Sequence, residues 1–190
     1  AGGRAAMADK KLLMQWVEQI PSQRLRNYLF QNKGDLTFKD QSLAWGFHEG
    51  SFSNGASYAD LDADGDLDLI INNIDDPAFI YENLAEKKFP ARTYVRVKPV
   101  DEQGAPVLNA KVKVVAGGVT QQKELTTCRG YQSSVEPILH FGLGEVEEVD
   151  SIVIYWPDET VTSWEELPTG QTYTLKRTDS AMPRKTIAGS

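Results

Sequence analysis

The pattern of hydrophobic positions changes character near residue 28. Before that point, apolar residues recur every three or four positions, as they do along one face of a helix. This pattern predicts a short amphipathic helix within residues 9–27, which Pro21 ends because proline breaks helices. We expect the helix to pack on its own domain, although a membrane-surface or partner-binding helix is an alternative. The apolar positions are Leu12, Leu13, Trp16, Val17 and Ile20. Residues 1–8 are small and Gly-rich and are typical of a leader.

From residue 28 onward the apolar runs are short and separated by turn signals, which is typical of β-strands. Gly117-Gly118 separates two of these runs in the way that a tight hairpin requires. Seven strands at this spacing predict a β-sandwich over residues 93–178, before a tail at residues 179–190. The predicted strands are Tyr94–Lys98, Ala110–Ala116, Val119–Thr127, Ile138–Phe141, Ser151–Tyr155, Val161–Trp164 and Thr172–Lys176.

Residues 28–92 contain an internal repeat. Residues 28–38 align with residues 79–89, and the aromatic, aliphatic and Asn positions coincide at an offset of 51 residues. The two copies begin Tyr28-Leu29-Phe30-Gln31-Asn32 and Phe79-Ile80-Tyr81-Glu82-Asn83. Repeats of this period are typical of β-propeller blades. A complete propeller has about four to eight blades, so the chain would be either the end of a larger protein or a single blade packed on the second region.

The charge of the chain is concentrated between the two copies of the repeat. The protein has 190 residues, with 27 acidic and 20 basic side chains and a formal charge of −7. Five aspartates fall within nine residues, and like charges at this density repel unless they are solvated or neutralised by a cation. Because strand-like segments flank them, we expect a cation site rather than a solvated tail. The candidate metal residues are Asp60, Asp62, Asp64, Asp66 and Asp68.

The spacing of these aspartates predicts calcium. With Asp60 at position 1, the side chains at positions 1, 3 and 5 turn inward together, and Gly65 at position 6 permits the sharp turn. Asp66 would contribute its backbone carbonyl and Asp68 its carboxylate. An EF-hand is excluded because position 12 is Ile71 rather than Glu. Calcium is favoured over magnesium since it accepts many oxygens in loose geometry. A solvated acidic turn without metal is the alternative.

Composition excludes several other classes of partner and site. The acidic balance argues against nucleic acid, because phosphate binding needs clustered Lys and Arg. No apolar run approaches the ~18 residues of a transmembrane segment. One Cys and two His exclude a Cys/His zinc cage and an internal disulfide framework. A bound Ca²⁺ would reduce the formal charge from −7 to about −5.

Three further features of the sequence are candidates for chemistry. His140 has no acid partner at triad-like spacing, which favours a structural strand histidine over a catalytic one. Cys128 would need a nearby base to act as a nucleophile. One loop combines a cation, an aromatic ring and an amide that can bind a sugar or a carboxylate, although a purely structural loop is favoured. The candidate ligand-binding residues in this loop are Arg129, Tyr131 and Gln132.

Two stretches of the chain resemble known families. Phe52 to Asp68 is similar to the FG-GAP/VCBS repeat of integrin-like β-propellers, and this resemblance covers residues 28–89. The second half resembles the ASPIC/UnbV domain that follows such repeats in the cartilage acidic protein family. Glu159 departs from that pattern, since relatives usually have Gly after Trp-Pro-Asp. The segments that carry this second resemblance are Asn109–Val112, Arg129–Ser134, Leu139–Gly144, Val149–Ser151 and Trp156–Asp158.

Together these features predict a mainly β protein. Its parts would be an N-terminal helix, one integrin-like propeller blade or hairpin with a calcium loop, and a β-sandwich domain. The resemblance implies a secreted, periplasmic or cell-surface recognition or scaffold module with a protein or glycan partner, and it supplies no reaction. A carbohydrate-active enzyme that uses Arg129, Tyr131 or His140, and a structural cap for a propeller, are the alternatives.

Overall fold

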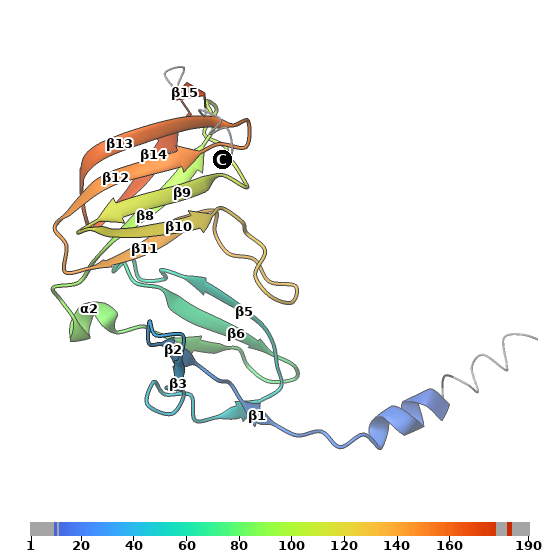
Figure 1. The fold of residues 1–190 in the computed structure, drawn as a ribbon. Helices are drawn as coiled ribbons and strands as arrows, with labels where there is room; N and C mark the ends of the chain where they lie inside the picture. The colour runs from blue at the N-terminus through green and yellow to red at the C-terminus, as the bar shows by residue number, and fades with distance from the viewer. Residues whose placement is uncertain (1–9, 11, 178–181, 184–190) are drawn as a thin grey trace, which may run out of the picture. The chain divides into compact units, whose positions relative to one another are not determined.

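The computed structural model describes residue 10, residues 12–177 and residues 182–183 (Figure 1). The chain divides into two compact units. The first comprises the described residues up to Asn54 together with Asn73–Pro77, and the second comprises Gly55–Asn72 with the described residues from Ala78 onward. The predicted leader at residues 1–8 lies outside the described residues.

The first unit holds the N-terminal helix and two pairs of short strands. Residue 10 and residues 12–18 are helical, so the predicted helix is confirmed but ends before Pro21. Residues 25 and 26 form a strand instead. Our expectation that the helix packs on its own domain is wrong, because Leu13, Trp16 and Ile20 are 57%, 59% and 65% exposed. The strands are β1 (Leu25–Arg26), which pairs antiparallel with β4 (Gly50–Ser51), and β2 (Phe30–Asn32), which pairs antiparallel with β3 (Phe38–Asp40).

The two copies of the sequence repeat form strands that pair with different partners. The first copy forms β2, which pairs with β3. The second forms β7 (Phe79–Tyr81), which pairs with β6 (Asp68–Asn73) and leads into the short helix α2 (Ala85–Lys88). Strands β6 and β7 form a three-stranded sheet with β5 (Ser53–Ala59), in the order β5-β6-β7. The acidic loop connects β5 to β6.

The remainder of the second unit is a β-sandwich that contains all seven predicted strands. One sheet has the order β10-β9-β12-β13-β15 and the other the order β11-β8-β14, and Figure 1 shows the two layered on each other. Strand β14 runs parallel to β8, and the other pairings described within these two sheets are antiparallel. The strands are β8 (Thr93–Val100), β9 (Lys111–Ala116), β10 (Val119–Glu124), β11 (Leu139–Gly144), β12 (Glu148–Tyr155), β13 (Thr160–Pro168), β14 (Gln171–Lys176) and β15 (Met182–Pro183).

Period-two alternation forms the core of this sandwich. Val95 and Val97 of β8 point inward, as does Phe141 of β11, and each is fully buried. Burying one such side chain stabilises the fold by roughly 1.5–3 kcal/mol. The intervening residues of β8 and β11 therefore lie on the opposite, outer face, where register pairs Arg96 with His140 and Tyr94 with Gly142. The other buried members of the cluster are Ala110, Val112, Val114, Leu125, Leu139, Val149, Ile152, Ile154, Trp156 and Leu175.

Two turns fit the backbone that the sequence implies. Gly117 and Gly118 have φ values of +55° and +76° and close the predicted β9–β10 hairpin. Glu159, in the turn between β12 and β13, has a φ of +68°, which is the left-handed region that favours glycine. The turn therefore keeps the conformation expected with Gly, although Glu occupies the position.

This geometry predicts that Glu159→Gly stabilises the protein. A left-handed conformation costs a residue other than glycine about 1–2 kcal/mol, and Glu159→Gly removes that cost. Glycine is more flexible in the unfolded chain, which offsets about 0.5–1 kcal/mol of the stabilisation. We expect a net gain of up to about 1 kcal/mol, or a rise in Tm of about 2–4 °C in thermal unfolding. Glu159→Ala is the matched control, because it removes the carboxylate but keeps the backbone strain. An equal rise in both variants would contradict the backbone explanation.

Candidate metal centre

Three aspartates of the acidic loop converge as their spacing predicts. Asp60, Asp62 and Asp64 each offer a carboxylate oxygen, and these oxygens lie within 4.8 Å of one another. Gly65 follows them with a φ of +96°, which supplies the expected sharp turn. Three carboxylates at this separation form an oxygen cluster suited to a hard cation.

Asp60 provides the clearest test of whether the loop fits a cation. Its side chain is only 3% exposed, and its Oδ2 accepts a hydrogen bond from Nη1 of Arg96 at 2.9 Å. Among the described residues, its Oδ1 has no hydrogen-bond partner. A buried carboxylate oxygen without a partner is costly. A cation in the cluster would remove that cost, so the residues fit the ion that the sequence predicts.

The outer face of β8 holds the loop in place. Arg96 bridges Asp60 of the loop and Glu136. Two residues earlier on the same strand, the ring of Tyr94 lies against Gly65, where a Cβ atom would stand 2.0 Å from a ring carbon. Glycine is therefore required at position 65 by its backbone conformation and by this close contact.

Asp64 also belongs to a second group of carboxylates, with Asp66 and Glu86, whose oxygens again lie within 4.8 Å of one another. A hydrogen bond from the Asp66 N–H lowers the pKa of Asp64. Burial and the charges of Asp62, Glu86 and Asp60 outweigh that bond, so the pKa of Asp64 is raised overall. The loop thus carries unrelieved repulsion around Asp64.

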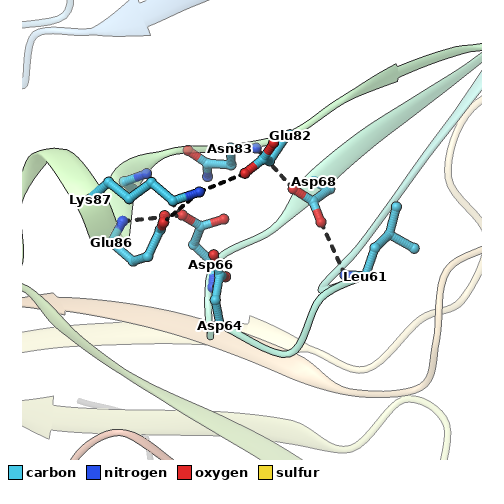
Figure 2. A network of polar contacts seen from close by, with 9 residues as sticks. Leu61, Asp64, Asp66, Asp68, Glu82, Asn83, Glu86 and Lys87 are labelled. Atoms are coloured by element: carbon cyan, nitrogen blue, oxygen red, sulfur yellow. Dashed lines mark hydrogen bonds and ion pairs between the residues drawn. The ribbon is translucent and has the colours of Figure 1, made fainter.

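The side chain of Asp66 points toward α2 (Figure 2). Its Oδ2 accepts hydrogen bonds from the N–H groups of Ala85 at 2.9 Å and Glu86 at 3.3 Å. Burial, with the nearby charge of Asp64, raises the pKa of Asp66 to about 6. Burial would also raise the pKa of Glu86, but hydrogen bonds with Lys87 and Asp66 outweigh it and lower that pKa. Of these two carboxyl groups, Asp66 is therefore the one that is protonated more readily as the pH falls.

Asp68 ties together the two ends of the loop. Its carboxylate accepts hydrogen bonds from the N–H of Leu61 at 3.0 Å and the N–H of Asn83 at 2.8 Å (Figure 2). The residue is buried. Within the described part of the chain, it belongs to neither converging group of carboxylates. The role of Asp68 as a metal ligand, like that of the Asp66 carbonyl, stays a prediction.

A cavity of about 590 Å³ lies beside the loop, and its lining includes Asp64, Tyr94 and His140. His140 stacks on Tyr94 at a centroid distance of 5.4 Å. Burial, with the positive charges of Lys123 and Arg96, lowers the pKa of His140 to about 4, so the imidazole is neutral at pH 7. The strand histidine that the sequence indicates is therefore half-buried at the wall of a cavity.

The predicted ligand-binding loop lies away from this cavity and folds against β5. Nε of Arg129 donates a hydrogen bond to the hydroxyl of Tyr58 at 3.1 Å, and the hydroxyl of Ser57 donates to the carbonyl of Ser134 at 2.8 Å. Tyr131 is 61% exposed. Gln132 is exposed and has a φ of +45°. Neither Arg129, Tyr131 nor Gln132 is among the residues that line the cavity, and their binding role stays a prediction.

Sequence reasoning missed Arg96, Tyr94 and Glu86, although all three surround the acidic loop. Arg96 lies 36 residues from its partner Asp60, and Glu86 lies 20 residues from its partner Asp66. Tyr94 contacts Gly65 from another strand. A pattern in one sequence carries no signal for such contacts. An arginine on the outer face of a predicted strand was the only available hint.

The comparisons with known proteins agree with the sandwich part of this description. Residues 101–182 match the family model described as "ASPIC and UnbV". Cartilage acidic protein 1 of Xenopus tropicalis is 30% identical over 115 residues, which is 55% of this chain and 16% of that protein. The mouse and human proteins of the same name are 26% identical over 151 residues, or 74% of this chain and 22% and 21% of theirs. The family match does not extend to residues 28–89.

The chain therefore carries an ASPIC and UnbV segment and is distantly similar to cartilage acidic protein 1. It spans about a fifth of the length of these relatives. Among the residues that the structure describes, no helix is both long and apolar enough to cross a membrane.

The buried ion pair predicts a large cost for Arg96→Met. The variant leaves Asp60 buried without its partner, which typically costs about 3–5 kcal/mol. Lys111→Met is the control, because the Lys111–Glu124 pair is about half exposed at 3.9 Å and should contribute about 0–1 kcal/mol. Chemical unfolding in chelator measures both variants. Similar losses in the two would contradict the importance of the buried pair.

The lowered pKa of His140 predicts a loss of stability in acid. The unfolded chain binds a proton at this residue near pH 6.5 and the folded chain only near pH 4. The free energy of unfolding should therefore fall as the pH drops through this window and be flat above it. In His140→Gln this contribution disappears, so the difference between wild type and variant should vary with pH between about 6.5 and 4. A constant difference would refute a buried neutral His140.

Proposed function

We propose that this protein is a calcium-binding recognition or scaffold module that acts outside the cytoplasm. The observation that carries the proposal is the environment of Asp60. This buried residue is one of the three clustered carboxylates, and its Oδ1 has no hydrogen-bond partner among the described residues. The predicted ligand set contains only oxygen donors, namely Asp60, Asp62, Asp64, the Asp66 carbonyl and Asp68. Such a set suits Ca²⁺, which accepts six to eight oxygens in flexible geometry.

The calcium in this proposal is structural. It neutralises the repelling carboxylates of the loop and thereby holds the loop closed against the outer face of β8, to which Arg96 already binds Asp60. The loop joins β5 to β6, so the ion would stabilise the sheet that contains them. A weak site would suffice outside the cell, where extracellular modules bind calcium with a Kd of about 10⁻⁴–10⁻³ M.

The recognition role is supported by resemblance. The sequence of residues 52–68 is similar to FG-GAP/VCBS repeats, and we propose that β5, β6 and β7 belong to a blade of that type. The matching relatives are named as acidic proteins of cartilage. A secreted, periplasmic or cell-surface location and a protein or glycan partner follow as parts of the proposal. The enzyme alternative is weaker, because the lining of the cavity includes His140 but not Arg129 or Tyr131.

Calcium should raise the thermal stability of the protein. At about 10 mM Ca²⁺, ten to a hundred times the expected Kd, mass action stabilises the folded state by about 1.4–2.7 kcal/mol. Differential scanning calorimetry in CaCl₂ and in EGTA measures the shift. We expect Mg²⁺ at the same concentration to give a smaller shift, because it demands stricter geometry.

Two matched variants locate the effect. Asp62→Asn removes a carboxylate of the cluster at an exposed position and should abolish most of the calcium shift, while the apo Tm should not fall because a repelling charge is removed. Asp150→Asn removes an exposed carboxylate from β12, outside the cluster, and should keep the full shift. The absence of a calcium shift in the wild type, or an equal shift in both variants, would sink the calcium proposal.

A further inference from the structure

We propose that the cavity beside the acidic loop binds a neutral saccharide ring through its hydroxyl groups. This inference rests on the proposed recognition function and specifies where a glycan would bind. The cavity of about 590 Å³ lies within the second unit and is formed by the acidic loop, the α2 region, the start of β8 and the outer face of β11. Its volume falls in the range of small-molecule sites.

Gly142 is the first observation that points to a ligand. It lies in strand β11, on the cavity wall, and pairs with Tyr94 in the register of the sheet. Its φ is not in the left-handed region, and no described atom lies within 4 Å of the position that a Cβ would occupy. Neither a left-handed φ nor a packing contact therefore requires glycine here, although the register of β11 shifts between Gly142 and Gly144, where a bulge favours glycine. The missing side chain leaves open space on the cavity wall, at the strand position that pairs with Tyr94.

The walls of the cavity combine aromatic and apolar surfaces. Tyr94 and His140 form a stacked pair with an angle of 14° between their planes. On another part of the wall, the guanidinium of Arg92 lies over the ring of Phe89 at 4.0 Å. Flat apolar faces with a few polar groups are the usual surroundings of small-molecule ligands.

The polar groups of the lining fit hydroxyls, which both donate and accept hydrogen bonds. Acceptors come from Asp66 and Glu86, and one Glu86 carboxylate oxygen lies 3.2 Å from the Lys87 ammonium. Donors come from Arg92 and the amide of Asn83. When Asp64 binds the proposed calcium, the carboxylates of Asp66 and Glu86 still repel an anion, so a neutral polyhydroxyl ring fits better than an acidic or sulfated sugar.

The binding test is saturation-transfer NMR on the whole chain in calcium. The probes are the neutral methyl glycosides of glucose, galactose and mannose, with glucuronate as the acidic comparator and glucosamine as the cationic one. We expect at least one neutral glycoside to bind with a Kd of the order of millimolar and glucuronate to bind at least tenfold more weakly. Binding of the charged sugars alone, or of none of the probes, would overturn the inference.

Gly142→Val tests the location. Valine suits a strand, and its side chain would occupy the open space on the cavity wall, so binding should weaken at least tenfold. Thr174→Val is the control, because it places the same side chain on β14 at an exposed position outside the cavity lining. Unchanged binding in Gly142→Val would overturn the site. Because the calcium shift in Tm is measured separately and should persist in both variants, failure here is distinguishable from failure of the calcium proposal.

Discussion

Electrostatic repulsion among the aspartates of one short loop is the constraint on which the rest of the site depends. Asp60, Asp62 and Asp64 bring carboxylate oxygens within 4.8 Å of one another, and Asp60 does so from a nearly buried position. At such separations, repulsion in a partly dry environment is severe unless a counter-charge is present. The surrounding structure supplies one in Arg96 and leaves the other Asp60 oxygen without a partner.

The sandwich makes this arrangement possible because its core is rigid. Inward-facing side chains such as Val95, Val97 and Phe141 are fully buried, which places β8 and β11 firmly in register. The alternate positions on these strands then present Tyr94, Arg96 and His140 on the outer face. The loop therefore rests on a surface whose geometry is set by packing elsewhere. Gly65 can approach the ring of Tyr94 closely because it has no Cβ atom.

A second contact in the same unit has a different character. The loop that contains Arg129 is held against β5 by hydrogen bonds to Tyr58 and from Ser57. Gly55 permits this approach, since a Cβ there would stand 2.5 Å from the hydroxyl oxygen of Ser133. The sandwich therefore contacts β5 and β6 at two places. Arg96 binds the acidic loop, and the loop that contains Arg129 binds β5. Arg129, which the sequence suggests as a ligand-binding residue, is one of the residues that make this contact.

Local patterns determined the strands, the Gly117-Gly118 hairpin and the turn-forming Gly65, because alternation and turn chemistry act over a few residues. They also determined that the aspartates at positions 1, 3 and 5 converge. Only the tertiary structure decided that Arg96 neutralises Asp60, that Glu86 joins Asp64 and Asp66, and that the N-terminal helix leaves its apolar stripe exposed. These outcomes depend on which distant segments meet, and the choice of partners is set by the packing of the whole unit rather than by the spacing of residues within any one segment.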